Sequence, residues 1–272
     1  MINKPKKLNL LSFFLLTFSF AESQVYSTIE NIPYYGYEST DSYQNERCKL
    51  DLYYPKYLND FTTVVWFHGG GLKAGNKYIP EKLKEKGIAV IAVNYRLSPK
   101  VKAPKYINDA AAAVAWTFNN ISKFGGNPSK IIVSGSSAGA YLTMMVGLDK
   151  TYLKSYGINA DKILALFPLS GQTITHFTVR GEQNISRNRP IVDIFAPLYH
   201  VRSETPPVFI YTGDPELESY GRVEENAYFA RMLKVLGNKK IKHTILGGYG
   251  HGKEQYEAVF PLMIREIIKL NK

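Results

Sequence analysis

The sequence predicts an α/β domain: a mostly parallel sheet covered by helices on both faces. Three observations predict this class. Short β-branched and aromatic runs alternate with longer helix-like stretches along the chain. Glycine-rich strings at residues 68–71 and 135–139 each follow such a run directly. No linker separates the two strings. We therefore expect one domain over residues 24–272.

The predicted strands are apolar runs, most of them bounded by Gly, Pro, Asn or Asp, and this composition is typical of buried strands in a parallel sheet. In chain order they cover residues 51–55, 63–67, 88–93, 131–134, 162–169, 207–211 and 241–246.

The predicted helices lie between these strands. Gly87 and Gly237 stand where two of them should stop. Four consecutive alanines at residues 110–113 favour close packing of another helix on the sheet. The helices cover residues 78–86, 104–120, 140–146, 223–236 and 254–270.

The stretch at residues 170–205 interrupts this alternation. It is polar and contains Gly181, Pro190 and Pro197, with only short apolar pieces. A connection of this length within a compact domain is usually functional. We expect a short cap, at about residues 171–205, that lies over the site described next.

The string Gly-Ser-Ser-Ala-Gly at residues 135–139 has the form and setting of a nucleophile elbow. It follows one predicted strand and leads into a helix, so a sharp turn would expose the hydroxyl of Ser137 above the sheet edge. The string His-Gly-Gly-Gly at residues 68–71 offers bare backbone N–H groups. We expect the oxyanion-stabilising donors to be the N–H groups of Gly70, Gly71 and Ala138.

A serine nucleophile needs a base, and five histidines are available. His251 lies in a glycine-rich loop between the last strand and the last helix, at the edge where the elbow opens. We therefore predict His251 as the base. His68 is expected to brace the glycine string, His176 and His200 lie in the interruption, and His243 lies within a predicted strand.

The acid of such a triad should follow the strand at 207–211, where three carboxylates occur. Glu216 is favoured because its longer side chain extends beyond the turn. Asp214 remains the alternative, although it precedes Pro215 and therefore suits a turn-forming role. Glu218 is interpreted as the start of a solvated face.

The first 23 residues have the three-part pattern of a secretory signal peptide. Three lysines precede an apolar run at residues 8–20, and small residues stand before Gln24. The run is shorter than the about 20 residues that a membrane-spanning helix needs. The mature protein is therefore expected to be secreted or periplasmic, without a stable membrane span. The single cysteine, Cys48, is expected to be a buried structural thiol.

The chain is basic, with a formal net charge of +11, and removal of residues 1–23 lowers it to +9. The Lys and Arg residues are spread along the chain and are not interleaved with aromatic residues as in nucleic-acid-binding proteins. Because of this distribution, we do not expect the protein to bind nucleic acid. A solvated basic surface is therefore the favoured interpretation, with attraction to anionic cell-envelope polymers or acidic glycans as the alternative.

From about residue 48 to residue 270 the chain resembles the α/β hydrolases, specifically bacterial carboxylesterases near the hormone-sensitive-lipase-like and feruloyl-esterase-like groups. The resemblance depends on the strings at 68–71 and 135–139, Asn-Tyr-Arg-Leu at 94–97, Phe-Gly-Gly-Asn-Pro at 124–128 and Gly-His-Gly at 250–252. It implies an eight-stranded sheet and an acyl-enzyme mechanism without cofactor or metal. Relatives often have Gly-x-x-Asp after the seventh strand, and Glu216 stands in that Asp position.

The sequence thus predicts a secreted serine carboxylesterase for small acyl esters, such as acetyl or feruloyl esters of polysaccharides; the substrate rests on the resemblance. Two alternatives stay open. One is a secreted peptidase of the prolyl-oligopeptidase type, although Ala138 replaces the bulky aromatic residue expected after that serine. The other is a non-catalytic glycan-binding module on a hydrolase fold. The sequence indicates no oligomeric state.

Overall fold

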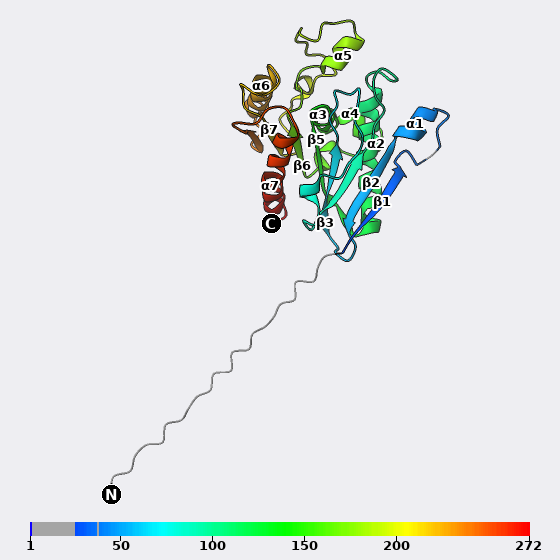
Figure 1. The fold of residues 1–272 in the computed structure, drawn as a ribbon, viewed down its shortest axis with the longest axis vertical. Coiled ribbons are helices and arrows are strands. Elements are labelled where there is room, and N and C mark those ends of the chain that lie inside the picture. Colours follow the sequence, from blue (N-terminus) through cyan, green and yellow to red (C-terminus); the bar gives the residue numbers. More distant parts are fainter. Residues whose placement is uncertain (2–24, 37) are drawn as a thin grey trace.

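An eight-stranded sheet runs through the computed structural model, which describes residue 1, residues 25–36 and residues 38–272 (Figure 1). The strand order is β1-β2-β4-β3-β5-β6-β7-β8. All pairings from β4 to β8 are parallel, whereas β2 is antiparallel to both β1 and β4. The predicted fold class is therefore confirmed. The strands are β1 (Tyr26–Pro33), β2 (Lys49–Pro55), β3 (Phe61–Phe67), β4 (Ala89–Val93), β5 (Gly126–Ser136), β6 (Ala165–Leu169), β7 (Val208–Thr212) and β8 (Ile241–Ile245).

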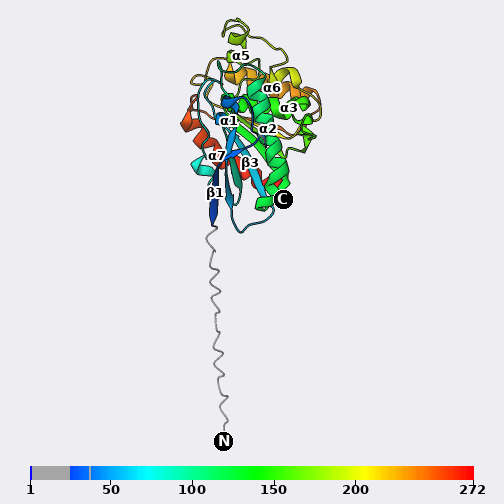
Figure 2. The ribbon, with the colours of Figure 1, turned by 90° about the vertical axis from the view of Figure 1, so that its right-hand side faces the viewer.

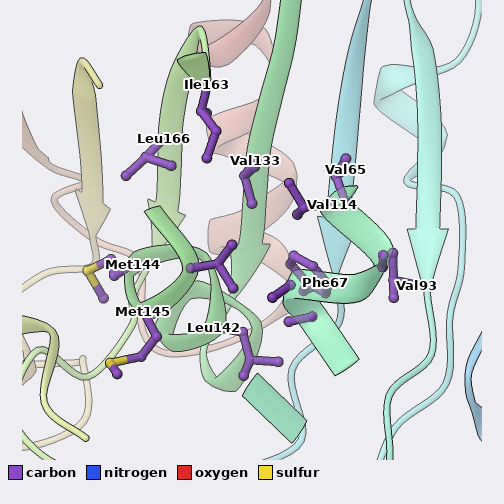
Figure 3. Close-up of a cluster of buried hydrophobic side chains, with 14 of the residues drawn as sticks. Val65, Phe67, Val93, Val114, Val133, Leu142, Met144, Met145, Ile163 and Leu166 are labelled. Carbon is purple, nitrogen blue, oxygen red and sulfur yellow. The ribbon is translucent and has the colours of Figure 1, made fainter. Parts of the chain in front are cut away.

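The helices cover both faces of this sheet. Side chains of α2, α3 and α6 share one buried apolar cluster with alternate residues of the central strands, and part of this cluster appears in Figure 3. Side chains of α7 pack on the other face, against the intervening residues of the same strands. The helices are α1 (Ser42–Arg47), α2 (Lys105–Asn120), α3 (Ala138–Leu148), α4 (Lys150–Lys154), α5 (Phe177–Glu182), α6 (Arg222–Val235) and α7 (Lys253–Leu270).

The central strand β3 shows why a parallel sheet has continuous apolar runs. All seven of its residues are buried, with Val65 and Phe67 on the face of α2 and α3 and Val64 and Trp66 on the face of α7. Helices on both sides remove every side chain of such a strand from water. The carboxyl ends of the parallel strands therefore meet at one protected edge, where the glycine-rich strings begin.

Two local predictions were wrong. Residues 78–86 do not form a helix, and only Glu81–Leu83 makes a 3₁₀ turn. Of the residues in this turn only Leu83 is buried, so little apolar burial anchors a longer helix. The edge strand β1 was not predicted, because most of its residues are exposed and lack an apolar alternation.

The interruption after β6 contains α5 and a 3₁₀ turn at Pro197–His200. Both views place α5 beyond the end of the sheet that is opposite the start of β1 (Figures 1 and 2). The hydroxyl of Thr178 on α5 donates to the carbonyl of Gly71 at 2.5 Å, which holds the interruption against the glycine string. The predicted signal peptide at residues 1–23 lies outside the described residues, apart from Met1. Among the described helices, none has both the length and the hydropathy needed to cross a membrane.

Candidate active site

Ser137 occupies a sharp turn between β5 and α3. Its backbone has φ 53° and ψ −114°, a conformation that side-chain-bearing residues rarely adopt. The turn is held because the N–H of Ser137 donates to the carbonyl of Leu169 on β6 at 2.8 Å. The strained backbone directs the hydroxyl away from the sheet edge, as a nucleophile elbow does.

The two glycines that flank this turn are there because no side chain fits. A Cβ on Gly135 would lie 2.5 Å from the carbonyl carbon of Gly139. A Cβ on Gly139 would overlap the carbonyl oxygen of Phe67 at the end of β3. The strand, the turn and the following helix thus pack at a distance that only glycine permits.

Ser137, His251 and Glu218 are hydrogen-bonded in a row. The Nε2 atom of His251 lies 2.9 Å from the Oγ atom of Ser137. Its Nδ1 atom lies 2.5 Å from Oε1 of Glu218. Ser137 is therefore joined through the imidazole to a carboxylate, and the three come from the elbow, the loop before α7 and the loop after β7.

The Glu218 carboxylate is fully buried but has four further donors around it. Its Oε2 atom accepts from the hydroxyl of Ser170 at 2.6 Å and from the amide group of Gln255 at 3.1 Å, and it also accepts from the N–H of Gly213. Its Oε1 atom accepts from the N–H of Ser219. Burial by itself raises the pKa of Glu218, but the hydrogen bonds from His251 and Ser170 outweigh it and lower the pKa to about 2. The group is thus ionised at neutral pH.

The choice of Glu216, and the alternative Asp214, as the carboxylate beside His251 was wrong. Glu216 is exposed, and the carboxylate bonded to Nδ1 of His251 is that of Glu218. Asp214 forms the turn: its side chain accepts from the N–H groups of Glu216 and Gly248, and these bonds lower its pKa. Its carbonyl accepts from the N–H of Glu218 at 2.8 Å.

That last hydrogen bond closes one helical turn, and the sequence contains a signal for this turn that would have identified Glu218. Asp214 followed by Pro215 has the pattern of a helix start, with an N-cap and a proline in the first turn. One helical turn then brings residue 218 back over the end of β7, whereas residue 216 points to the opposite side.

The glycine string at 68–71 lies beside the elbow. A Cβ on Gly69 would be 3.3 Å from Cβ of Ser137, and one on Gly70 would overlap the carbonyl oxygen of Ala74. Gly70 and Gly71 both have positive φ angles, and both line the cavity that contains Ser137. Ala138 supplies the first N–H of α3, and the first N–H groups of a helix have no acceptor within it. Ala138 thus follows Ser137 directly in the chain, and the other two predicted oxyanion donors, Gly70 and Gly71, line the same cavity as Ser137.

The other four histidines have structural contacts of their own. His68 is buried, bonded through Nδ1 to the carbonyl of Gly69 and stacked on Tyr95. His176 caps the start of α5, and His243 contacts Thr212. His200 contacts a carbonyl within the interruption. Only His251 touches Ser137.

A cavity of about 630 Å³ opens above Ser137. Phe177 and Arg187 reach it from the interruption, and Tyr78, Tyr256 and Phe260 supply an aromatic wall. The hydroxyl of Tyr256 lies 3.2 Å from Nε2 of His251. Sequence reasoning missed Tyr256, although its position in the first turn of α7, just after His251, indicates it. No group of three or more potential metal ligands occurs in the described part of the chain.

Comparisons with known proteins find esterases among the similar chains. The BD-FAE family matches residues 50–166. Isoprenylcysteine alpha-carbonyl methylesterase of Arabidopsis thaliana is 29% identical over 220 residues, which cover 71% of this chain and 51% of the relative. Esterase LipC of Mycobacterium tuberculosis is 24% identical over 206 residues, which cover 69% and 50%. The chain thus spans about half the length of the curated relatives it matches.

Two solved structures show the same fold over almost the whole chain. A truncated form of a carbohydrate esterase from gut microbiota has a TM-score of 0.74 at 18% identity, with 92% of this chain and 98% of that chain covered. Thermogutta terrifontis esterase 2, phosphoramylated by tabun, has a TM-score of 0.69 at 20% identity, with 89% and 94% covered.

Proposed function

Because this chain has the fold of solved esterase structures and resembles carboxylesterases of the hormone-sensitive-lipase-like and feruloyl-esterase-like group, we propose that it is an α/β hydrolase and an exported serine carboxylesterase. The observation that carries the proposal is the row Ser137–His251–Glu218 on a strained elbow. A serine hydroxyl becomes a nucleophile when a base accepts its proton and a third group orients the base.

In the first half of the reaction, Oγ of Ser137 attacks the ester carbonyl carbon while its proton passes to Nε2 of His251. Glu218 stays ionised, holds the Nδ1–H of His251 and stabilises the imidazolium. The carbonyl oxygen becomes an oxyanion that accepts from the N–H groups of Ala138, Gly70 and Gly71. His251 then gives the proton to the departing alcohol oxygen, the carbon–oxygen bond breaks, and an acyl-enzyme remains.

In the second half, water repeats this chemistry. His251 accepts a proton from the water as its oxygen attacks the acyl carbon. When the tetrahedral intermediate collapses, His251 returns that proton to Oγ of Ser137, and the carboxylic acid leaves. Each turnover therefore consumes one ester and one water and restores the original protonation of Ser137 and His251.

The proposed substrates are small acyl esters, including acetyl or feruloyl esters of polysaccharides. The ring of Phe177 lies so near Gly71 that a Cβ there would be 3.0 Å away, which limits the room for a long acyl chain. The aromatic wall of Tyr78, Tyr256 and Phe260 suits a short or aromatic acyl group. One structural neighbour is named a carbohydrate esterase, which supports a polysaccharide ester. The signal-like pattern of residues 1–23 supports export.

The test combines turnover with covalent labelling. Purified protein should hydrolyse 4-nitrophenyl acetate, and a fluorophosphonate probe should label Ser137. We expect Ser137→Ala to abolish labelling and to lower kcat by roughly 10⁶-fold, as in another serine hydrolase. Ser129→Ala, an exposed serine on β5, is the matched control and should change neither readout.

Three results would contradict the proposal. One is retention of more than about a tenth of the rate in Ser137→Ala, equivalent to a barrier change below about 1.4 kcal/mol. Another is cleavage of proline-containing peptides without ester hydrolysis, which would indicate the peptidase. The third is polysaccharide binding by Ser137→Ala with no hydrolysis by the unmodified protein, which would indicate a binding module.

A further inference from the structure

A second cavity of about 690 Å³ adjoins the one above Ser137. The two cavities share four lining residues, Phe177, Arg187, Ser219 and Arg222. The second lies between the interruption and the start of α6. A substrate whose ester is held at Ser137 can therefore extend a neighbouring group into this space.

Three arginines line the second cavity, and two of them are buried. Arg180 on α5 is 3% exposed and Arg222 on α6 is 6% exposed, whereas Arg187 is exposed and stacks over the ring of Phe177. The Nη1 atom of Arg180 donates to the carbonyl of Arg189 at 2.7 Å. Its Nε atom is buried and has no acceptor among the described residues. A buried donor without a partner is costly, so an acceptor supplied by a ligand or by water would stabilise the site.

The charges around this cavity do not balance. Among the described residues that line it, Glu225 is the only one with a carboxylate. One oxygen of Glu225 accepts from Nε of Arg222 at 2.8 Å, and the other accepts from the N–H groups of Thr173 and Ile174. Burial lowers the pKa of Arg180; Glu225 acts against this effect, and the charges of Arg187 and Arg222 add to it. Three cations thus line the cavity with one carboxylate, whose oxygens are already occupied.

We propose that this cavity binds a carboxylate carried by the ester substrate itself, so that the protein prefers acylated acidic sugars over neutral ones. Guanidinium groups bind carboxylates through paired, charge-assisted hydrogen bonds. Gln172, Asn188 and Tyr220 line the same cavity and offer partners for sugar hydroxyls. The net charge, +9 after removal of residues 1–23, also favours an anionic polymer as the source of the ester. This inference rests on the proposed esterase function.

The experiment compares two forms of one substrate: acetylated uronic-acid oligosaccharides, and the same oligosaccharides with their carboxylates reduced to primary alcohols. Acetate release gives kcat/KM for each. We expect kcat/KM to be at least about tenfold higher on the acidic form, which corresponds to about 1.4 kcal/mol. High salt should narrow this preference, because Arg187 is exposed.

Two variants on the same loop separate the cavity from general surface charge. Arg187→Gln should lower the ratio of kcat/KM on the acidic form to kcat/KM on the reduced form by about tenfold. Arg189→Gln removes an equal charge from an exposed side chain that does not line the cavity, and should change neither value. Arg180→Gln tests the buried donor, with its thermal unfolding measured alongside.

Hydrolysis of 4-nitrophenyl acetate distinguishes a failure of the esterase proposal from a failure of the carboxylate-site proposal. If neither the unmodified protein nor any arginine variant hydrolyses 4-nitrophenyl acetate, the proposed esterase function is wrong. If all hydrolyse it but the acidic and reduced oligosaccharides give equal kcat/KM, the carboxylate site is wrong. Free uronic acid that speeds hydrolysis of the reduced form would make the cavity a separate effector site and would also overturn the inference.

Discussion

The elbow at residues 135–139 and the acid loop at residues 213–218 hold their functional side chains by different means. The elbow is fixed by backbone packing, since Gly135 and Gly139 stand where any Cβ would strike a neighbouring strand or helix. The acid loop is fixed by polar contacts, since Glu218 accepts hydrogen bonds from His251, Ser170, Gln255 and backbone N–H groups.

This difference determines how each region should respond to change. The tightly packed backbone of the elbow has no room for an added atom. Such an atom would displace the whole turn, and Ser137 would lose its position. A carboxylate within several hydrogen bonds can lose one donor and keep its place, although its charge becomes less stable. The elbow should therefore fail abruptly, whereas the acid loop should weaken in steps.

After Ser137→Ala, the largest expected effect is in the acid loop. Glu218→Gln removes the charge that orients His251 and stabilises the imidazolium, and we expect kcat on 4-nitrophenyl acetate to fall by about 10⁴-fold. Glu216→Gln is the matched control, because Glu216 is exposed and does not contact His251. Circular dichroism of each variant checks the fold.

Asp214→Asn sharpens this comparison. Its side chain supports the turn that brings Glu218 to His251, so we expect a small loss of kcat together with a lower melting temperature. A near-normal Glu218→Gln beside a strongly impaired Glu216→Gln or Asp214→Asn would show that the assigned carboxylate is wrong.

The next effect tests the packing of the elbow. Gly139→Ala places a Cβ against the carbonyl oxygen of Phe67, and we expect a loss of roughly 1–3 kcal/mol in the free energy of unfolding. The displaced Ser137 should lower kcat/KM by about 100-fold. Gly181→Ala on α5 is the control, because no atom lies within 4 Å of the added Cβ. Unchanged stability and rate in Gly139→Ala would refute the steric account of the elbow.

The smallest effect concerns the ionisation of Glu218. Ser170→Ala removes the donor to Oε2, so we expect the pKa of Glu218 to rise from about 2 and kcat to fall by about tenfold or less. A folded-state pKa below the unfolded value of about 4.3 adds stability above that pH and loses it as the pH falls toward about 2.

Ser170→Ala should therefore be less stable than the unmodified protein at about pH 6, and this difference should shrink as the pH approaches about 2. Denaturant unfolding at several pH values measures it. Ser219→Ala is the control, because only the backbone N–H of Ser219 contacts Glu218. A pH-independent difference would mean that Ser170 acts through packing alone.

What the sequence predicts well is what depends on neighbouring residues. The strings at 68–71 and 135–139 contain the glycines that their own turns require, so Ser137 could be predicted from a short stretch of sequence. In the structure His251 is hydrogen-bonded to it, as predicted. Glu218 was missed because its role depends on Ser170, Gln255 and His251, which come from three other segments. The edge strand β1 was missed for a similar reason, since pairing with β2 and not its own burial defines it.

The direction in which β1 enters the sheet has a consequence for attaching this protein to a support. Tyr26 pairs with Pro55, at the amino end of the parallel strands, whereas Ser137 follows the carboxyl end of β5. A linker joined ahead of β1 would therefore be attached at the end of the sheet that is opposite Ser137. An immobilised or surface-displayed form tethered there would have the cavity above Ser137 facing away from the support. This orientation suits an insoluble polymer that cannot diffuse to the protein.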